Sequence, residues 1–375
     1  MVLHVLKSYI YSGAENVVCQ IIENTNEDAL YLSPRGPIEE VLRERGIKYR
    51  GIDKLDKATL LEVIEEVKPD LVHAHDFSAS VICGLACKGK YPVISHIHCN
   101  PPWLKSRFNP KSLSYLYASR YFAAILTVSD AVMDEYVYAN RIKCQVKVLG
   151  NPFSVESVFN KADFNEKKYS LSNDKIIESD EAIRDTIEES VNLSNQDLGF
   201  SSDILYVGRL SEEKNPLRAL EVIEELCKIR PDLRANIVGD GALMDACKSF
   251  VSENGLEKNV SLLGFQKNPY NYMAKTKVVI VPSNWEGFGL VALESMTFSK
   301  PVLASGAGGL SNLVDDSCGA ICTNVKEYVA EAKKLFEDEK YYLKKANGAL
   351  EKAKKFDNIK SYAKSIDEVY KEVER

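Results

Sequence analysis

Residues 283–295 read Ser-Asn-Trp-Glu-Gly-Phe-Gly-Leu-Val-Ala-Leu-Glu-Ser, and they follow an apolar run at 277–282. The short apolar run predicts a buried strand, and the residues after Gly289 are expected to form a helix. Glu286 then lies in a glycine-rich loop, and Glu294 lies eight residues later on the helix. Strand–loop–helix units of this kind build parallel sheets, whose ligands bind beyond the carboxyl ends of the strands.

The same alternation of apolar runs and helical patterns extends through both halves of the chain. In the first half the predicted strands are 2–6, 29–32, 70–75, 92–98, 124–128 and 145–149. In the second half they are 203–208, 234–239, 260–264, 277–282 and 301–304. This alternation predicts parallel sheets that helices cover on both faces. Because 375 residues are too many for one ordinary domain, we predict an α/β fold with two doubly wound, Rossmann-like domains.

The net charge of −6 is concentrated in the middle of the chain. Residues 155–200 hold 5 Lys and Arg against 11 Asp and Glu, and they are poor in strand signals. We interpret this stretch as a surface insertion, within which residues 180–191 have the pattern of a short acidic helix. A nucleic-acid-binding protein would show a basic stripe, so no nucleic-acid partner is expected.

The sequence also bears on the compartment of the protein. No apolar run reaches the roughly 18 residues of a membrane span, and the first residues lack the pattern of a signal peptide. The nine cysteines are an odd number and contain no Cys-x-x-Cys pair, which indicates reduced core residues. We therefore expect a cytoplasmic protein.

Two cations follow the first predicted strand of the second half. Residues 206–216 read Tyr-Val-Gly-Arg-Leu-Ser-Glu-Glu-Lys-Asn-Pro, which places Arg209 and Lys214 at a turn between a strand and a helix. Exposed cations generally contribute little. At the carboxyl end of a strand, however, an arginine fork and a lysine point charge favour phosphate binding. Together with the carboxylates of Glu286 and Glu294, which accept hydrogen bonds from sugar hydroxyls, these cations indicate a nucleotide-sugar site.

Two glycine turns are further candidates for binding an anion. Gly13 follows the first predicted strand, and residues 306–311 (Gly-Ala-Gly-Gly-Leu-Ser) follow the strand at 301–304. Glycine lets a ligand approach the backbone closely, and free N–H groups at the start of a helix favour a phosphate. Each turn alone is weak support for this role, because most glycines at such turns are structural.

Four histidines follow an alternating pattern at the ends of two predicted strands. His73 and His75 end one strand. His96 and His98 end the next, and in each pair the two side chains lie on the same face. A zinc cluster of these four would lack the helical spacing and the carboxylate motif of common zinc sites. We favour a structural role, capping of the strand end, for His73 and His75, and a hydrogen bond to a ligand hydroxyl or carbonyl for His98.

The ordered set of motifs resembles the retaining nucleotide-sugar glycosyltransferases of the GT4 family, which have the GT-B fold. The matching motifs are Ser12-Gly13-Ala-Glu, His98, Asn151-Pro152, Val-Gly208-Arg209-Leu with Glu213-Lys214-Asn, Val-Gly239-Asp-Gly241, Leu-Gly264-Phe265, and Glu286-Gly287-Phe288-Gly289-Leu290 with Glu294. The resemblance implies two Rossmann-like domains facing a central cleft, at 1–153 and 201–356, with an acidic linker or insertion at 154–200. A final helix at about 357–375 would pack back on the first domain. Two departures are Ser12, where the family often has another glycine, and the length of the middle segment.

By this resemblance the donor lies in the cleft, mostly on the second domain. Arg209 and Lys214 would bind the diphosphate, and Glu294 would hold the ribose hydroxyls. Glu286 would contact the donor sugar, and His98 would lie near the transferred sugar, as the two catalytic residues. The remaining donor-binding residues would be Gly13 on the phosphate side, Gly264 and Phe265 along the base, and the loop residues Gly287, Phe288, Gly289 and Leu290.

The resemblance also implies that no cofactor and no metal take part, and the sequence has no Asp-x-Asp ion site. Breaking the bond between the anomeric carbon and phosphate develops negative charge on the leaving diphosphate, which Arg209, Lys214 and helix N-termini would stabilise. Two mechanisms stay open for retention: front-face attack, in which the departing phosphate helps to deprotonate the acceptor, and a covalent step at Glu286. The expected partners are a nucleotide sugar carried by UDP or GDP and a glycan or lipid-linked acceptor of bacterial cell-surface synthesis.

Two other functions are compatible with parts of this pattern. A nucleotide-sugar epimerase of the same fold would use the nucleotide sugar alone. A non-catalytic sensor of nucleotide sugars would tolerate the loss of His98 or Lys214, yet both are present. The spacing of Glu286 and Glu294 favours the transferase over the epimerase.

The stretch 101–122 combines four cations with six aromatic residues and contains no acid. Cations and aromatics together suit the interface of an anionic membrane, so one interpretation is peripheral attachment to the inner face of the cell membrane. The other interpretation is an ordinary core helix with a solvated basic face, in which Leu113, Leu116 and Tyr117 pack inside. The sequence leaves both interpretations open.

Overall fold

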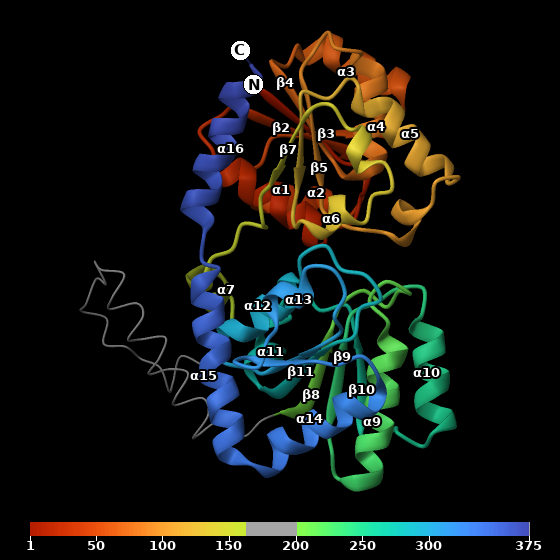
Figure 1. Ribbon diagram of the computed structural model, residues 1–375, viewed down its shortest axis with the longest axis vertical. Helices are drawn as coiled ribbons and strands as arrows, with labels where there is room; N and C mark the ends of the chain where they lie inside the picture. Colours follow the sequence, from red (N-terminus) through yellow and green to blue (C-terminus); the bar gives the residue numbers. More distant parts are fainter. Residues whose placement is uncertain (163–200, 375) are drawn as a thin grey trace, which may run out of the picture. The chain divides into compact units, whose positions relative to one another are not determined.

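The computed structural model describes residues 1–162 and 201–374 of the chain. Its contacts divide into two compact units, Met1–Phe153 with Asn358–Arg375 and Ser154–Asp357 (Figure 1). The first unit thus contains the last helix of the chain as well as the N-terminal sheet. Each unit is an α/β domain with its own parallel sheet, as the alternation of strands and helices predicted.

The first unit has a seven-stranded sheet in the order β3-β2-β1-β4-β5-β6-β7, and all neighbouring strands in it are parallel. The strands are β1 (Val2–Val5), β2 (Ala29–Pro34), β3 (Tyr49–Ile52), β4 (Leu71–His75), β5 (Val93–Ile97), β6 (Ala124–Thr127) and β7 (Gln145–Val148). Strands β1, β4, β5 and β6 are buried along their whole length, because helices cover both faces of the sheet. The strand order reverses at β1 and β4, which is where ligands bind in open α/β sheets.

The last helix of the chain covers one face of this first sheet. The helices of the unit are α1 (Gly13–Asn24), α2 (Ile38–Glu44), α3 (Lys57–Val67), α4 (Asp76–Cys87), η1 (Pro102–Lys105), α5 (Pro110–Ser119), α6 (Ala131–Asp134), η2 (Ala139–Arg141) and α16 (Ile359–Val373). Helix α16 contacts α1 (Figure 1) and buries Ile366 and Val369 at helical spacing. The Tyr370 hydroxyl lies 2.8 Å from Nδ1 of His73 on β4. The face of the sheet that carries His73 is therefore closed by the C-terminal helix.

The second unit has a six-stranded parallel sheet in the order β10-β9-β8-β11-β12-β13. The strands are β8 (Ser202–Val207), β9 (Ala235–Val238), β10 (Val260–Gly264), β11 (Thr276–Val281), β12 (Val302–Ala304) and β13 (Gly319–Ile321). The helices are α7 (Val155–Phe159), α9 (Pro216–Ile229), α10 (Met244–Glu253), α11 (Tyr270–Ala274), α12 (Leu290–Thr297), α13 (Leu310–Leu313), α14 (Val325–Glu337) and α15 (Glu339–Lys355). The reversal of strand order lies here between β8 and β11.

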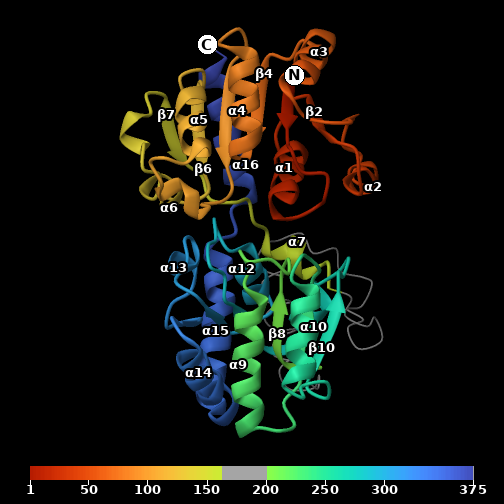
Figure 2. The ribbon, with the colours of Figure 1, turned by 90° about the vertical axis from the view of Figure 1, so that its right-hand side faces the viewer.

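Helix α9 shows how the sequence sets the start of a helix beside the predicted cation turn. Pro216 occupies its first turn, and the side chain of Asn215 accepts a hydrogen bond from the Arg218 N–H at 3.3 Å. Its buried residues, among them Leu220 and Leu226, belong to the core of the unit. Helices α9 and α10 pack side by side (Figure 2). The start of α9 is thus fixed by the cap, and its position is fixed by the core.

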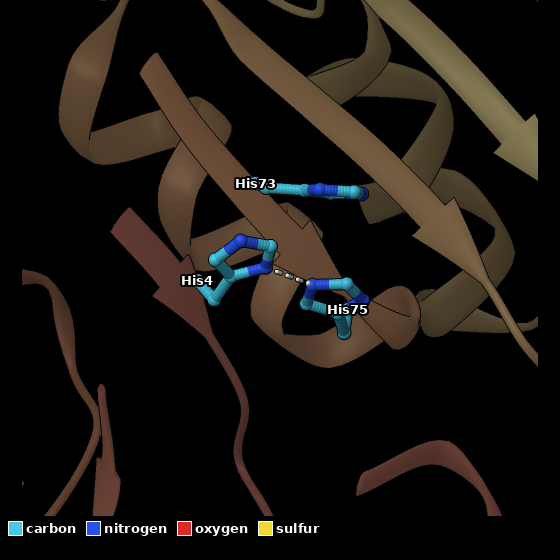
Figure 3. Close-up of side chains that lie close together, drawn as sticks. All are labelled: His4, His73 and His75. Carbon is cyan, nitrogen blue, oxygen red and sulfur yellow. Dashed lines mark hydrogen bonds between the residues drawn. The ribbon is translucent and has the colours of Figure 1, made fainter. Parts of the chain in front are cut away.

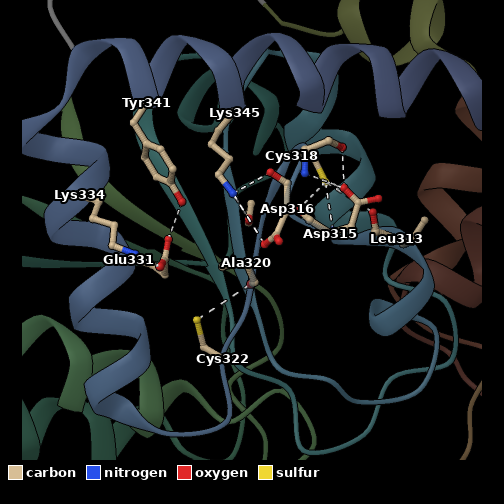
Figure 4. A network of polar contacts seen from close by, with 12 residues as sticks. Leu313, Asp315, Asp316, Cys318, Ala320, Cys322, Glu331, Lys334, Tyr341 and Lys345 are labelled. Atoms are coloured by element: carbon tan, nitrogen blue, oxygen red, sulfur yellow. Dashed lines mark hydrogen bonds and ion pairs between the residues drawn. The ribbon is translucent and has the colours of Figure 1, made fainter.

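Buried polar contacts tie helix α15 to the loop between α13 and β13 (Figure 4). Lys345 is 4% exposed, and its Nζ donates to the carbonyl oxygens of Asp316 at 2.7 Å and Gly319 at 2.9 Å. Lys352 adds an ion pair with Asp315 at 2.7 Å. A buried ammonium is tolerated only with such partners, so these contacts anchor the loop that follows the glycine turn after β12.

The structure departs from the sequence-based expectations in two strands and one boundary. Strand β3 buries only Ile52 fully, and β13 has three residues, so neither gives a clear periodic signal. Residues 154–162, which we assigned to the linker, belong instead to the second unit and include α7. The predicted acidic helix at 180–191 lies outside the described residues.

Candidate functional site

The predicted site residues of the second unit follow the carboxyl ends of its strands. Arg209 comes two residues after β8, Gly264 is the last residue of β10, and Glu286 lies in the loop between β11 and α12. Because these strands are parallel members of one sheet, their ends lie at the same edge. A backbone hydrogen bond of 2.8 Å from the Asn284 N–H to the Glu213 carbonyl joins the glutamate loop to the cation loop.

Lys214 and Glu286 form an ion pair across these two loops. Nζ of Lys214 lies 2.8 Å from Oε2 of Glu286 and 3.1 Å from Oε1 of Glu213. Oγ of Ser283 also donates to Oε2 of Glu286, at 3.3 Å. Burial disfavours the charged ammonium, but the two carboxylates outweigh burial and raise the pKa of Lys214. Lys214 is therefore a charge already compensated by two carboxylates.

Arg209 is exposed at the tip of the same turn. The hydroxyl of Tyr206 donates to the carbonyl oxygens of Arg209 at 3.0 Å and Lys214 at 3.4 Å. These bonds tie both ends of the turn to the buried end of β8. An exposed guanidinium on a turn with a fixed backbone is suited to bind a phosphate.

Glu294 lies on α12 and is held by an aromatic residue that the sequence analysis did not single out. The hydroxyl of Tyr270, at the start of α11, donates to Oε1 of Glu294 at 3.1 Å. Nζ of Lys161 lies 5.5 Å from the centroid of the Tyr270 ring. Burial raises the pKa of Glu294 to about 7, against the opposing effects of Lys161 and Tyr270. The carboxyl group is thus balanced between its neutral and charged forms near neutral pH.

The raised pKa of Glu294 predicts a pH-dependent gain in stability on replacement with glutamine. Between pH 4.5 and about 7, folded Glu294 keeps a proton that the unfolded chain releases, so the stability that this group contributes falls as the pH rises through this window. Glutamine is neutral at every pH and removes this dependence. In thermal unfolding without nucleotide, the Tm of Glu294→Gln relative to the wild-type protein should rise between about pH 5 and about pH 8. A Tm difference that stays constant over this range would contradict the raised pKa.

Close backbone contacts explain the glycines around Glu286. Gly289 opens α12 with a φ of +104°, and a Cβ there would lie 2.7 Å from Cδ2 of Leu310. A Cβ on Gly309 would lie 2.7 Å from the carbonyl oxygen of Gly287. The Gly309 N–H donates to the Glu286 carbonyl at 3.2 Å. The glycine turn after β12 therefore supports the Glu286 loop, and its phosphate binding stays a prediction.

The other residues predicted to bind the nucleotide sugar differ in their exposure to solvent. Phe288 is 7% exposed, and its ring packs edge-on against Phe356. Its side chain is therefore used in packing, and a ligand would contact its backbone. Leu290 is half-buried in the first turn of α12. Phe265, by contrast, is 69% exposed and follows Gly264, which has a φ of +65°. Its ring offers a flat apolar surface at the end of β10.

Gly13 and His98 lie in the first unit, after β1 and β5. A Cβ on Gly13 would meet nothing within 4 Å, so packing inside the unit does not require a glycine there. His98 belongs to a cluster that contains every histidine of the chain, namely His4, His73, His75, His96 and His98. The in-register pairing of β1, β4 and β5 places the histidines of these strands on one face of the sheet.

Two hydrogen bonds between ring nitrogens organise the cluster. Nδ1 of His4 lies 3.0 Å from Nε2 of His75 (Figure 3), and Nδ1 of His75 lies 3.0 Å from Nε2 of His98. Burial lowers the pKa of His4 to about 3 and that of His98 to about 4, so both rings are neutral at pH 7. The capping role expected for His73 and His75 is wrong. His75 makes no side-chain cap bond at the start of α4, because its ring nitrogens bond His4 and His98, and His73 bonds Tyr370 of α16.

The orientation of the rings distinguishes this cluster from a zinc site. Two overlapping sets of three histidines, both containing His75, bring ring nitrogens within 4.8 Å of one another. The ligands of a zinc ion direct their lone pairs at the ion from about 2.0–2.1 Å. Here His75 meets His4 and His98 with centroids 5.3 Å apart and interplanar angles of 14° and 21°. With nitrogens only 3.0 Å apart, these rings meet edge to edge and share a proton. We therefore interpret the cluster as a hydrogen-bonded network.

Sequence reasoning missed several residues that hold the predicted ones in place. Glu213 is adjacent to Lys214, and Ser283 lies three residues before Glu286. A polar residue this close to a predicted charged residue could have indicated a contact between them. His4 carried the signal of a lone polar residue in an apolar strand. Tyr270 and Lys161 gave no signal, because they reach Glu294 from segments distant in the sequence.

Comparisons with known sequences match both halves of the chain. The family described as "Glycosyl transferases group 1" matches residues 197–371, and the family described as "Glycosyltransferase Family 4" matches residues 13–157. One relative is N-acetylgalactosamine-N,N'-diacetylbacillosaminyl-diphospho-undecaprenol 4-alpha-N-acetylgalactosaminyltransferase of Campylobacter jejuni, 36% identical over 161 residues, which cover 42% of this chain and 43% of that protein. Another is an uncharacterized glycosyltransferase of Methanocaldococcus jannaschii, 30% identical over 275 residues, which cover 72% of this chain and 66% of that protein. In both relatives the matched region is less than two thirds of the full length.

A comparison with solved structures matches the fold along the whole chain. HepE from Anabaena, solved with UDP-glucose, has a TM-score of 0.78 at 20% identity, and the match covers 99% of both chains. At this level of identity the likeness shows the GT-B fold alone. Since the two family matches together span both domains, and the fold agrees from end to end, the chain belongs to the GT4-type glycosyltransferases with the GT-B fold.

Proposed function

We propose that the protein is a retaining glycosyltransferase that moves a sugar from a UDP-sugar to a hydroxyl of a lipid-linked glycan. The observation that carries this proposal is the ion pair of Lys214 and Glu286, because it sets a phosphate-binding ammonium beside a carboxylate that can accept hydrogen bonds from sugar hydroxyls. UDP is the preferred carrier because HepE, with the same fold, was solved with UDP-glucose. A lipid-linked acceptor of cell-surface glycan synthesis is preferred because the name of the Campylobacter jejuni relative specifies a diphospho-undecaprenol substrate.

The donor contacts of the second unit follow from the chemistry of each group. Arg209 and Lys214 would bind the diphosphate and stabilise the charge that develops on it as it leaves. Glu294, with a pKa of about 7, would accept hydrogen bonds from the ribose hydroxyls in its charged form. The exposed ring of Phe265, following Gly264, would pack along the base.

Two residues of the first unit complete the proposed contacts. Gly13 would bring its backbone N–H to the phosphate side of the donor, and a Cβ at this position would meet nothing within 4 Å, which leaves room for that approach. His98 would contact the transferred sugar. Its Nδ1 is buried and has no hydrogen-bond partner among the described residues, which fits a nitrogen that bonds a ligand.

The Lys214–Glu286 pair favours front-face attack over a covalent step at Glu286. A carboxylate that already bonds an ammonium at 2.8 Å and a hydroxyl at 3.3 Å has less electron density to give to an anomeric carbon. Glu286 is better suited to orient the sugar. The departing phosphate, held by Arg209 and Lys214, would then take the proton of the acceptor hydroxyl.

The proposed transfer predicts activity without a divalent metal. The two cations and the helix N-termini supply the charge stabilisation for which other transferases use a metal ion. With a panel of UDP-sugars and an undecaprenyl-diphosphate-linked glycan, we expect a product one sugar longer, formed at the same rate with and without EDTA. Loss of transfer in EDTA and its return with magnesium or manganese would contradict the metal-free mechanism. Conversion of the UDP-sugar into its epimer without acceptor would contradict transfer itself.

We further propose that η1 and α5 bind an anionic membrane surface that holds the acceptor. None of the helices in the described ranges is long and apolar enough to cross a membrane. Phe108 is 91% exposed, and Leu113 and Tyr117, which the alternative interpretation placed in the core, are 46% and 49% exposed. The guanidinium of Arg120 stacks 4.4 Å from the Tyr117 ring. An exposed apolar strip with cations beside it is typical of a surface that binds at a lipid interface.

The membrane surface predicts binding to anionic vesicles. At low salt the protein should float with liposomes that contain phosphatidylglycerol and stay in the soluble fraction with neutral ones. Replacing both Phe108 and Leu113 with serine should shift the protein to the soluble fraction, because both side chains are exposed and their loss leaves the core intact. The matched control replaces Tyr9 and Ile10 with serine. These two residues are 50% and 51% exposed elsewhere on the first unit, and their replacement should leave vesicle binding unchanged. A wild-type protein that stays soluble at every lipid composition would favour a soluble acceptor.

A further inference from the structure

The histidine cluster contains a chain of three rings with a defined number of protons. Nδ1 of His4 bonds Nε2 of His75, and Nδ1 of His75 bonds Nε2 of His98, each at 3.0 Å. The two end nitrogens, Nε2 of His4 and Nδ1 of His98, are buried without a hydrogen-bond partner among the described residues. A neutral imidazole carries one N–H, so three rings supply three protons. Two protons fill the two bonds, and the third must sit at one of the two ends.

Only two arrangements of these protons make both bonds. In the first, every ring carries its proton on Nδ1, so His4 donates to His75, His75 donates to His98, and His98 ends with an Nδ1–H. In the second, every ring carries its proton on Nε2, the bonds run in the opposite direction, and His98 ends with a bare Nδ1. A change at one ring reverses all three. The tautomer of His98 is thus set by a residue two rings away.

Two features of the surroundings favour the first arrangement. Both end nitrogens lack a hydrogen-bond partner among the described residues, but His4 is only 1% exposed, whereas His98 is half-buried just after the end of β5. Because a buried N–H without a partner is rare, the N–H is better placed at His98, where a ligand could accept its hydrogen bond. The carboxylate of Glu15, itself 3% exposed on α1, acts on His98 and opposes the effect of burial on the His98 pKa. Its negative charge favours the arrangement whose N–H end lies at His98.

We infer that His4 and His75 are positioning residues that hold His98 in its Nδ1–H tautomer, so that His98 presents a hydrogen-bond donor to its ligand. A donor at this position bonds an oxygen of the sugar or the phosphate and does not remove a proton. This role in the reaction rests on the proposed glycosyl transfer, whereas the arrangement of protons does not. His73 and His96 lie outside the chain of bonds: the His73 ring stacks on His75 with centroids 4.2 Å apart, and the His96 ring is tilted against His98 with centroids 4.3 Å apart.

Nitrogen NMR of the histidine rings tests the arrangement directly. The chain has five histidines, all in this cluster, so a ¹⁵N-histidine sample gives five ring systems, and His98 is assigned by its loss in His98→Asn. At pH 7 we expect His4, His75 and His98 as neutral rings protonated on Nδ1. An Nε2–H tautomer at His98 would overturn the inference. Ring signals that shift on dialysis against EDTA would also overturn it, because they would show nitrogens bound to a metal.

A matched pair of variants at position 4 tests the coupling. Asparagine at position 4 places an amide N–H near the Nδ1 position and can still donate to His75, so His98 should keep its Nδ1–H. Aspartate has the same shape but only accepts, so His75 must donate to it from Nε2, and His98 should switch to Nε2–H. A His98 that keeps its Nδ1–H in His4→Asp while His75 stays neutral would overturn the relay. If His4→Asp does not fold, the wild-type spectrum alone decides the inference.

Turnover links the relay to the proposed function. His4→Asp should transfer sugar at least about tenfold more slowly than His4→Asn. The two variants should bind UDP similarly, because His4→Asp removes only the hydrogen bond that the Nδ1–H of His98 donates to the transferred sugar. Predicted tautomers in a protein that transfers no sugar would leave the relay standing and contradict the proposed function. Equal turnover of the two variants, with the tautomer reversed, would overturn the donor role of His98.

Discussion

Replacing Lys214 with alanine should weaken the binding of UDP by about 1.5–3 kcal/mol, because in the proposed site Lys214 makes a charge-assisted hydrogen bond to the diphosphate. The structure favours the upper end of this range. The carboxylates of Glu286 and Glu213, which lie 2.8 Å and 3.1 Å from the ammonium, would lose their counter-charge and repel the diphosphate. Titration calorimetry with UDP, in the absence of acceptor, measures the effect as a rise in Kd of roughly ten- to a hundredfold.

Lys228→Ala is the matched control for Lys214→Ala. Lys228 lies on α9 in the same unit, and its Nζ also pairs with two carboxylates, Glu224 at 2.9 Å and Glu225 at 2.7 Å. These ion pairs lie within one helix and away from the sheet edge, so UDP affinity should be unchanged. Thermal unfolding of both variants separates a loss of binding from a loss of the fold. Wild-type affinity for UDP in a folded Lys214→Ala protein would contradict the assignment of Lys214 to the diphosphate.

Glu286→Ala and Glu294→Ala should fail in different ways. Glu286→Ala should lower turnover by about a hundredfold or more, since in the proposed mechanism Glu286 orients the transferred sugar, and its carboxylate pairs with Lys214. Glu294→Ala should instead weaken the binding of UDP and of the UDP-sugar by the same factor, because both carry the ribose that Glu294 is proposed to hold. Steady-state kinetics together with titration of UDP and a UDP-sugar separate the two effects.

Glu331→Ala provides the control for these two variants. Glu331 also accepts a hydrogen bond from a tyrosine hydroxyl, that of Tyr341 at 2.8 Å, but it lies on α14 beside α15 (Figure 4). Its loss should leave both turnover and UDP affinity unchanged. The opposite pattern, with Glu294→Ala lowering turnover and Glu286→Ala lowering UDP affinity, would exchange the roles of the two glutamates.

The loops of the second unit show which parts of the site could be predicted from the sequence. Glu286 and Glu294 could be placed on a loop and a helix, because an apolar run followed by glycines is a local signal. Arg209 and Lys214 could be placed at a turn for the same reason. The ion pair between Lys214 and Glu286 could not be predicted, because it joins side chains 72 residues apart. Because of this ion pair, replacing Lys214 should weaken UDP binding more than the loss of one hydrogen bond would, since two carboxylates are left without their counter-charge.

The histidines show the same division in the first unit. Alternation along two strands correctly placed His73 with His75, and His96 with His98, on one face of each strand. The neighbouring strand that brings His4 into the cluster is β1, and the pairing of β1 with β4 is a property of the sheet. The assignment of His73 and His75 as strand caps failed because His73 bonds Tyr370 of helix α16, from the other end of the chain, and His75 bonds His4 and His98.

The sequence by itself determined the two α/β domains, the edge of each sheet at which the candidate functional loops lie, and the residue types in those loops. These features depend on the spacing of apolar residues and on glycine and proline, which act within a few positions of the chain. Only the tertiary structure decided that Lys214 pairs with Glu286, that burial raises the pKa of Glu294 to about 7 while Tyr270 bonds its carboxyl group, and that three histidines form one chain of hydrogen bonds. The charge and proton position of a side chain depend on its burial and its partners. Those partners come from strands and helices that meet only when the chain is folded.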